Sequence, residues 1–182
     1  MRVWPGALAA FERRWPRVSR GALAALDRRL LRILRTRAHA PPVEAAVTLL
    51  ARAGENGLLW HGLAATGAVL DGERRSVYLR AMRVVLIALL LNSAAKQLVR
   101  RMRPALEELP ALTPVISGRS YPSAHSSTSF AGARVLSEAM PAVPLYALAL
   151  AVAVSRPYLG VHYPSDVVAG ALLGDAVAEL VP

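Results

Sequence analysis

The sequence contains no cysteine, so neither a disulfide nor a thiolate metal site can contribute to its structure or chemistry. Lysine is almost absent as well: Lys96 is the one lysine among 182 residues that are otherwise rich in arginine. Aromatic residues make up only 5% of the chain, yet hydrophobic residues reach 54% and the mean hydropathy is +0.36. This hydropathy is high for a water-soluble protein and is typical of one that lies in lipid.

Negative charge is scarce near the N-terminus. Residues 1–40 contain ten arginines against Glu12 and Asp27, and so carry +8 of the formal net charge of +10. A basic segment of this kind can bind nucleic acid or anionic lipid. The hydrophobic body that follows favours anionic lipid over nucleic acid, because cytoplasmic arginines are attracted to the acidic leaflet. No apolar run follows the first charges, so we expect no signal peptide.

Residues 20–37 are predicted to form a basic amphipathic helix, because leucines recur at three- and four-residue spacing. They are Leu23, Leu26, Leu30 and Leu34. Such a helix can lie flat on a membrane, or it can be an ordinary surface helix packed against the body. Pro41 and Pro42 follow as a boundary. We therefore expect a membrane-surface arm, residues 1–42, and a main domain, residues 43–182.

The main domain lacks the alternating pattern of β-strands, so the predicted fold class is all-α. Six helices are expected, at about 43–54, 57–71, 76–101, 123–138, 141–155 and 164–181. Their apolar runs are roughly 11–16 residues long, whereas about 20 residues span hydrocarbon. Flanking arginines such as Arg80 and Arg83 can snorkel and extend a span, and Gly170 and Gly174 have the GxxxG spacing of closely packed membrane helices. We therefore favour an integral membrane bundle of six helices over a soluble helical bundle.

The excess of positive charge predicts that the N-terminal arm stays on the cytoplasmic side of the membrane. The arginine-rich turn at 71–83 then returns to the cytoplasm. With six spans, three places share the opposite, outer face: the end of the third helix, the start of the fourth, and the link between the fifth and sixth. The chemically distinctive residues lie at these three places, which predicts a single site.

The first place carries Lys96 and Arg103, followed by Pro104. Two helical turns separate the two cations, so we expect them on one helical face, where they could clamp a phosphate dianion. Pro104 is expected to mark the end of the helix. Arg100 and Arg101 in the same run favour the alternative of a lipid anchor.

The second place is Pro122-Ser123-Ala124-His125, at the predicted start of a helix. The free N–H groups and the positive dipole end of a helix N-terminus suit phosphate oxygens. Ser123 could cap the helix, bind an oxygen, or do both. A plain serine cap beside an incidental histidine is the alternative.

The third place is Ser155-Arg156, followed by His162 and Asp166. Pro164 favours a helix start, which places Asp166 in the first turn and near His162. A carboxylate that accepts one imidazole N–H fixes the tautomer and leaves the other nitrogen available as a nucleophile. A structural His–Asp pair that holds the last helix in place is the alternative.

The three places read K-x6-RP, PSAH and SR-x5-H-x3-D. In order and spacing they resemble the signature of the phosphatidic acid phosphatase type 2 superfamily, whose second motif reads PSGH. The motifs cover about 70 residues, and the six-helix layout extends the likeness over most of the chain from residue 43. The resemblance implies a phosphatase without a metal or other cofactor. The sequence agrees, because it has no clustered set of metal-ligand residues.

The resemblance also implies a role for each motif residue. His162 would be the nucleophile that forms a phosphohistidine, oriented by Asp166, and His125 would protonate the leaving oxygen and then activate water. Five groups would hold the phosphate oxygens: Lys96, Arg103, Arg156, Ser123 and the backbone N–H of Ala124. Ala124 stands where glycine is usual, which a helical backbone tolerates but a close phosphate contact would not.

Within the superfamily, this small hydrophobic chain resembles the bacterial membrane lipid phosphatases. We expect a lipid phosphate substrate, first a polyprenyl-linked one of cell-envelope synthesis such as undecaprenyl pyrophosphate or decaprenylphosphoryl-phosphoribose phosphate. The alternatives are phosphatidylglycerophosphate, phosphatidate, a soluble phosphomonoester, or a non-catalytic protein that binds anionic lipid. A binding protein has no use for a His–Asp pair and a second imidazole together, which counts against the last. The sequence does not indicate an oligomeric state.

Overall fold

The computed structural model describes residues 21–105, 109–115 and 117–182. Over these ranges the chain is all-α, which confirms the predicted fold class. The helices are α2 (Ala22–Thr36), α3 (Pro41–Ala53), η1 (Glu55–Gly57, a 3₁₀ turn), α4 (Leu58–Leu70), α5 (Arg75–Val99), α6 (Ala124–Leu136), α7 (Ala142–Tyr158) and α8 (Pro164–Leu180). The first half of the predicted arm, up to residue 20, lies outside the described residues.

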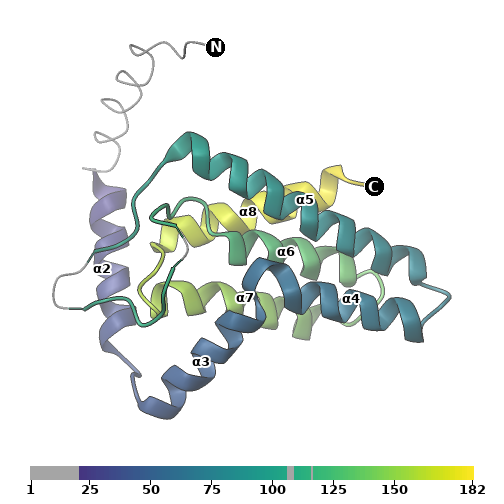
Figure 1. Cartoon of the computed structure of the whole chain (residues 1–182), viewed down its shortest axis with the longest axis horizontal. Coiled ribbons are helices and arrows are strands. Elements are labelled where there is room, and N and C mark those ends of the chain that lie inside the picture. Colours follow the sequence, from purple (N-terminus) through teal and green to yellow (C-terminus); the bar gives the residue numbers. More distant parts are fainter. Residues whose placement is uncertain (1–20, 106–108, 116) are drawn as a thin grey trace, which may run out of the picture.

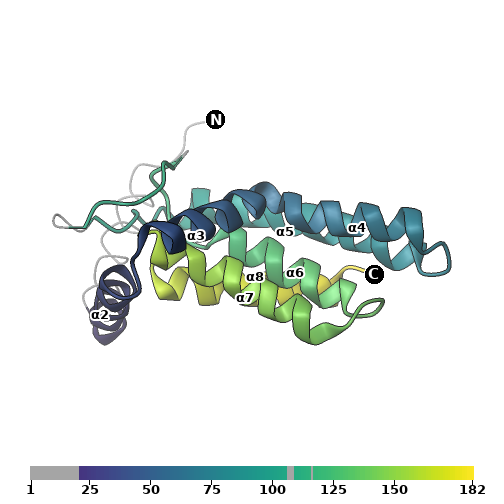
Figure 2. The same ribbon diagram turned by 90° about the horizontal axis from the view of Figure 1, so that it is seen from below.

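Helices α4, α5, α6, α7 and α8 run roughly along the long axis of the molecule, and α2 stands across one end of them (Figure 1). Seen from below, α4 and α5 form one layer over α6, α7 and α8 (Figure 2). Helix α6 is the central element, since it packs against α4, α5, α7 and α8. The long connection between α5 and α6 lies at the same end as α2, so the three motif-bearing places meet at that end.

Close helix contact in the centre depends on small residues. A Cβ added at Gly174 would lie 2.1 Å from the backbone oxygen of Ser127, and one at Gly170 would lie 2.4 Å from that of Ser123. The GxxxG pair of α8 therefore packs directly on the backbone of α6. Such contact needs glycine, because a methyl group would have to displace the main chain.

Helix α5 ends earlier than the sequence predicts. Arg100 adopts a left-handed conformation (φ 52°), and the chain then turns away from the helix axis. The N–H of Arg103 bonds the carbonyl of Gly118 at 3.0 Å instead of continuing the helix. The expectation that Lys96 and Arg103 lie on one face of one helix is therefore wrong. Arg103 reaches the site from the connection that follows α5.

Helix α7 in turn runs further than predicted, to Tyr158, so that Ser155 and Arg156 lie in its last turn. Pro157, one residue before the end, has no N–H to continue the helical hydrogen bonds, which favours an end of the helix there. Helix α8 begins at Pro164, the first helical position, as the sequence predicts.

Helix α2 docks on α7 and α8, but three of its four predicted leucines, Leu23, Leu26 and Leu30, stay exposed. Its buried stripe is Ala24, Asp27, Leu31 and Arg35, whereas Leu23 and Leu26 are about half exposed, at 55% and 50%. Arg35 donates to the backbone oxygens of Tyr158 (3.3 Å) and Pro110 (2.6 Å). One face of α2, which includes two charged residues, thus packs against the protein. Another face of the helix exposes leucines to the surroundings.

Apolar side chains also cover the outside of the bundle. Val69 of α4, Leu90 of α5, Val143 of α7 and Leu172 of α8 are among the large exposed hydrophobic residues. Among the described helices, α5 alone has both the length and the composition to cross a membrane, and α7 is a shorter apolar helix. The six-span arrangement remains a prediction.

Candidate active site

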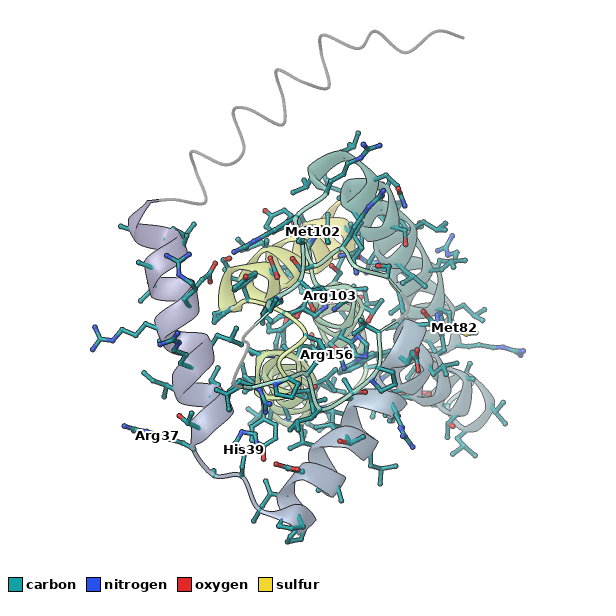
Figure 3. The ribbon with its side chains drawn as sticks, turned by 60° about the vertical axis from the view of Figure 1, so that its left-hand side comes forward. Arg37, His39, Met82, Met102, Arg103 and Arg156 are labelled. Carbon is teal, nitrogen blue, oxygen red and sulfur yellow. The ribbon has the colours of Figure 1, made fainter. Side chains whose placement is uncertain are left out.

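A cavity of about 520 Å³ opens at the end of the bundle where α2 stands. Its walls come from α5, the connection after α5, the start of α6, the end of α7 and the loop before α8. Figure 3 looks toward this end and places Arg103 and Arg156 close together near its centre. The predicted site residues that line the cavity are Lys96, Arg103, Ala124, His125, Arg156 and His162.

His162 is buried in the loop between α7 and α8, with 2% of its surface exposed. Its Nε2 lies 3.2 Å from Nη1 of Arg103. A guanidinium can only donate, so this contact makes Nε2 the acceptor and assigns the ring proton to Nδ1. The Nε2 lone pair therefore faces the cation that a phosphate oxygen would approach.

Burial is the main reason that the pKa of His162 lies well below its usual value of 6.5. The positive charges of Arg103, Lys96 and Arg156 lower it further, and the backbone of Ser120 opposes this only in part. All of these effects except the last disfavour the imidazolium. His162 is consequently neutral at pH 7, as a nucleophile must be.

Asp166 is completely buried in the first turn of α8. Its Oδ2 accepts a hydrogen bond from the N–H of Tyr163 (2.9 Å), and its Oδ1 accepts one from Arg101 (2.8 Å). Oδ2 also lies 3.6 Å from Nδ1 of His162, which is an ion-pair distance and longer than a hydrogen bond. In the described structure Asp166 therefore makes an ion-pair contact with His162 but no hydrogen bond to it.

The backbone of Asp166 joins two of the motifs. Its carbonyl accepts the N–H of Ser123 at 2.9 Å, so the start of α6 is fixed to the first turn of α8. Ser123 itself is fully buried, and its Oγ caps α6 through a long 3.5 Å contact with the N–H of Ser126. The geometry thus places Ser123 as a helix cap, behind the cavity wall. Its contact with a phosphate oxygen stays a prediction.

Ala124 is the first residue of α6 and lines the cavity. Its backbone is helical, so the methyl group that replaces the usual glycine causes no strain there. The neighbouring His125 holds its Nε2 at 2.9 Å from the backbone oxygen of Ala51, at the end of α3. That bond occupies Nε2 as a donor and leaves Nδ1 as the nitrogen able to exchange a proton with a substrate.

The cations are fixed to different degrees. Arg103 donates through Nε to the oxygen of Ser117 and through Nη1 to that of Val161, both at 2.7 Å. Arg156 is buried with 7% of its surface exposed, and within the described ranges its Nε has no hydrogen-bond partner. A buried, unpaired guanidinium N–H calls for an acceptor, and a phosphate oxygen would supply one.

Metal ligands are not assembled at this site. In the parts of the chain that are described, no group of three or more His, Cys, Asp or Glu side chains is placed to hold a metal ion. Glu55 is the one carboxylate on the cavity wall in those parts, facing a lining that is otherwise cationic or neutral. The donor set is that of an anion site, with fixed N–H groups and positive charges.

Sequence reasoning missed several contributors. Arg101, read as a possible lipid anchor, instead bonds Asp166, and Asp27 of α2 lies on the other side of Arg101. The one signal for Asp27 in the sequence is that residues 1–40, which are rich in arginine, contain only one other acidic residue, Glu12. Glu55, Asn56 and Arg119, which lie outside the three motifs, also line the cavity, as does Gln97, which occupies an unspecified position of the first motif.

The model of the PAP2 superfamily matches residues 78–182, a stretch that includes all three motifs. The chain therefore belongs to the PAP2 superfamily and is a lipid phosphate phosphatase, which confirms the predicted family and enzyme class. Over 141 residues, 78% of this chain, it is 35% identical to a decaprenylphosphoryl-5-phosphoribose phosphatase of Mycobacterium tuberculosis, of which the match covers 80%.

Two crystal structures share the fold. The chain resembles Aquifex aeolicus LpxE with a TM-score of 0.74 and 26% identity, covering 86% of this chain and 94% of the other. It resembles a transmembrane PAP2 type phosphatidylglycerolphosphate phosphatase from Bacillus subtilis with a TM-score of 0.74 and 23% identity, covering 96% and 91%. The second likeness concerns the fold alone.

Proposed function

We propose that this protein removes phosphate from a polyprenyl-linked phosphate, with decaprenylphosphoryl-phosphoribose phosphate as the first candidate, through a phosphohistidine on His162. The observation that carries the proposal is the position of the His162 Nε2, 3.2 Å from Arg103 and on the wall of a cavity that is also lined by Lys96, Arg119 and Arg156. A neutral imidazole among fixed cations is suited to attack a bound phosphate dianion.

The reaction has two steps. Nε2 of His162 attacks phosphorus and the ester P–O bond breaks. His125, protonated on both ring nitrogens while the phosphate dianion is bound, transfers its Nδ1 proton to the leaving oxygen. The charge of Asp166, 3.6 Å from Nδ1, stabilises the imidazolium character that develops on His162. His125 then takes a proton from water, which attacks the phosphohistidine, and the N–P bond breaks to release phosphate. Lys96, Arg103 and Arg156 neutralise the phosphoryl oxygens throughout, so we propose that no metal or other cofactor takes part.

Two observations support a phosphorylated sugar as the head group. The first is the similarity to the mycobacterial decaprenylphosphoryl-5-phosphoribose phosphatase over most of both chains. The second is the cavity wall, where Glu55, Asn56 and Gln97 add hydrogen-bonding groups that phosphate binding alone does not need. Carboxylate and amide groups suit the hydroxyls of a sugar. Undecaprenyl pyrophosphate lacks such hydroxyls and is the second candidate.

We further propose that the main domain, residues 43–182, is embedded in the inner membrane, with the N-terminal arm at the cytoplasmic leaflet and the cavity toward the outer face. The exposed apolar residues on α4, α5, α7 and α8 support the embedding. The open leucine face of α2 supports contact of the arm, residues 1–42, with lipid, where its arginines favour anionic head groups.

The absence of cysteine makes the orientation directly testable. We would label Gly72→Cys, in the turn before α5, and Ala111→Cys, in the connection after it, with a membrane-impermeant maleimide in intact cells. Ala111→Cys should react and Gly72→Cys should react only after lysis. The reverse pattern would place the cavity in the cytoplasm.

The function is tested by phosphate release from detergent-purified protein, wild type beside His162→Ala, with EDTA present. The substrates are decaprenylphosphoryl-phosphoribose phosphate, undecaprenyl pyrophosphate, phosphatidylglycerophosphate, phosphatidate and p-nitrophenyl phosphate. We expect the highest kcat/KM on the first, and no release by the variant. A preference for phosphatidylglycerophosphate or phosphatidate would instead assign the enzyme to phospholipid metabolism, and one for p-nitrophenyl phosphate to soluble substrates.

A further inference from the structure

Asp27 of α2 is nearly completely buried, with 3% of its side chain exposed, although it belongs to an arginine-rich surface segment. Its Oδ1 accepts the N–H of Ser165 (2.9 Å), and its Oδ2 accepts the hydroxyl of Ser165 (2.5 Å) and Nη2 of Arg101 (2.7 Å). A buried carboxylate with this many partners is fixed in position. All of its partners lie next to the proposed catalytic machinery.

Arg101 joins Asp27 to Asp166. While Nη2 bonds Asp27, Nη1 donates to Oδ1 of Asp166 at 2.8 Å and to Oγ of Ser165 at 2.7 Å. The guanidinium also lies over the ring of Tyr163, 4.1 Å from its centroid, and only 18% of the side chain is exposed. The oxygen of Asp166 that faces away from His162 is therefore held by a cation that Asp27 shares.

Asp27, Arg101 and Asp166 form a charged cluster beside His162. Its second carboxylate, Asp27, affects the net charge that His162 faces. Arg101 alone would cancel the charge of Asp166, and a neutral pair stabilises a developing imidazolium poorly. With Asp27 added, the three side chains carry a net charge of −1 beside His162. That negative charge opposes the charges of Arg103, Lys96 and Arg156, which disfavour a positive imidazole.

We propose that Asp27 is a positioning residue for the phosphatase reaction, which acts through Arg101 to keep Asp166 oriented and the cluster negative beside His162. The inference rests on the roles proposed above for His162 and Asp166. It assigns the arm helix a part in the chemistry in addition to membrane contact. It also separates Asp27 from Arg35, which docks the same helix by bonding only backbone oxygens.

Two substitutions at Asp27 separate charge from shape. Asp27→Asn keeps the shape and an acceptor oxygen but removes the charge, whereas Asp27→Glu keeps the charge and changes the shape. On the substrate that wild type hydrolyses best, we expect Asp27→Asn to lower kcat about 10- to 100-fold, by analogy with the loss of an outer partner that orients a metal ligand. KM should be unchanged, because the cavity cations are intact. Asp27→Glu should recover most of kcat.

Wild-type kcat in Asp27→Asn, or a kcat in Asp27→Glu as low as in Asp27→Asn, would overturn the proposal. Arg35→Met is the control for docking of α2, with thermal unfolding measured for every variant. It should lower the unfolding temperature and leave kcat unchanged. A loss of kcat equal to that in Asp27→Asn would reduce the role of Asp27 to docking.

Vanadate binding distinguishes failure of this inference from failure of the proposed function. If wild type hydrolyses no substrate of the panel, the proposed function fails. The Kd of vanadate, measured by titration calorimetry, still reports on His162 in that case. Vanadate adopts the five-coordinate geometry of the transition state, and its bond to an imidazole nitrogen depends on the same negative cluster. We expect the Kd to rise in Asp27→Asn and to return toward wild type in Asp27→Glu. Equal Kd values in all three proteins would overturn the inference independently of turnover.

Discussion

Nη1 of Arg103 lies 2.7 Å from the backbone oxygen of Val161 and 3.2 Å from Nε2 of the adjacent residue, His162. The cation and the proposed nucleophile are thus anchored to the same short loop, although 58 residues separate Arg103 from Val161 in the sequence. A phosphate oxygen that takes over the Arg103 N–H would uncover the Nε2 lone pair at the same time. Substrate binding and exposure of the nucleophile are therefore coupled in this geometry.

His162→Ala should abolish turnover, because no other imidazole reaches the same place among the three cations. We expect kcat to fall by at least about 10⁴-fold, as for loss of a covalent nucleophile. His61→Ala is the matched control, since His61 lies on α4 and is not among the residues that line the cavity. Substantial activity in His162→Ala, measured by phosphate release, would exclude the phosphohistidine mechanism.

The pH dependence follows from the depressed pKa of His162. The neutral ring is the attacking form, so activity is lost as the pH falls through that pKa. The acidic limb of kcat/KM, which reports on the free enzyme, should therefore lie below pH 6.5 after correction for ionisation of the substrate phosphate near pH 6.

Lys96→Met removes one of the charges that lower the pKa of His162, so in that variant the acidic limb should move to higher pH. The loss of a phosphate contact in the same variant changes the height of the profile, and the position of the limb is the quantity to compare. A wild-type limb at or above pH 6.5 would mean that His162 is not the group that titrates.

Arg103→Lys should impair the enzyme although the charge is kept. Arg103 uses its planar fork to bond Ser117, Val161 and His162 together, and an ammonium group cannot reproduce that arrangement. We expect kcat/KM to fall by about 10- to 100-fold, by analogy with the loss of an outer partner that orients a reactive group. If steady-state kinetics gave a wild-type kcat/KM, the charge alone would suffice and the fork geometry would be irrelevant.

Metal removal should have no effect. Prolonged dialysis against EDTA should leave kcat/KM unchanged, because the cavity offers cations and N–H groups where a metal would otherwise bind the phosphate. Vanadate should inhibit competitively in the same preparation. Loss of activity on dialysis that magnesium restores would contradict the proposed mechanism.

Gly174→Ala should destabilise the fold without touching the cavity. The added Cβ would lie 2.1 Å from the backbone oxygen of Ser127, so α8 would have to move away from α6, at a cost of about 1–3 kcal/mol. Gly62→Ala is the control, because nothing lies within 4 Å of a Cβ at that position of α4. Thermal unfolding in detergent should give a lower midpoint for Gly174→Ala, and an unchanged or higher one for Gly62→Ala, where alanine favours the helix by about 1 kcal/mol.

Local signals were enough to predict much of this molecule. Helical periodicity and the Pro164 start predicted the six helices of residues 43–182, and the order of the motifs predicted that Lys96, His125 and His162 would meet. The end of α5 was not predictable, because a left-handed arginine at position 100 has no local signature.

The orientation of α2 was not predictable either. Its leucine spacing left open whether the leucines face lipid or the body of the protein, and the face that packs on the protein contains Asp27 and Arg35. Their partners, Ser165 and Tyr158, lie 138 and 123 residues further along the chain. Contacts that distant leave no trace in periodicity or in short motifs, and only the folded chain reveals them.

The contact between Asp27 and Ser165 also constrains the order of assembly. Helix α2 is made early in synthesis, but its partner is at the start of the last helix, so Asp27 remains without that partner until the chain is nearly complete. Arg101 and Asp166 cannot reach their final arrangement before then. A nascent or truncated chain that lacks the last helix therefore holds the proposed phosphate-binding cations but not the complete His162–Asp166 pair, so we expect hydrolysis only when the last helix is in place.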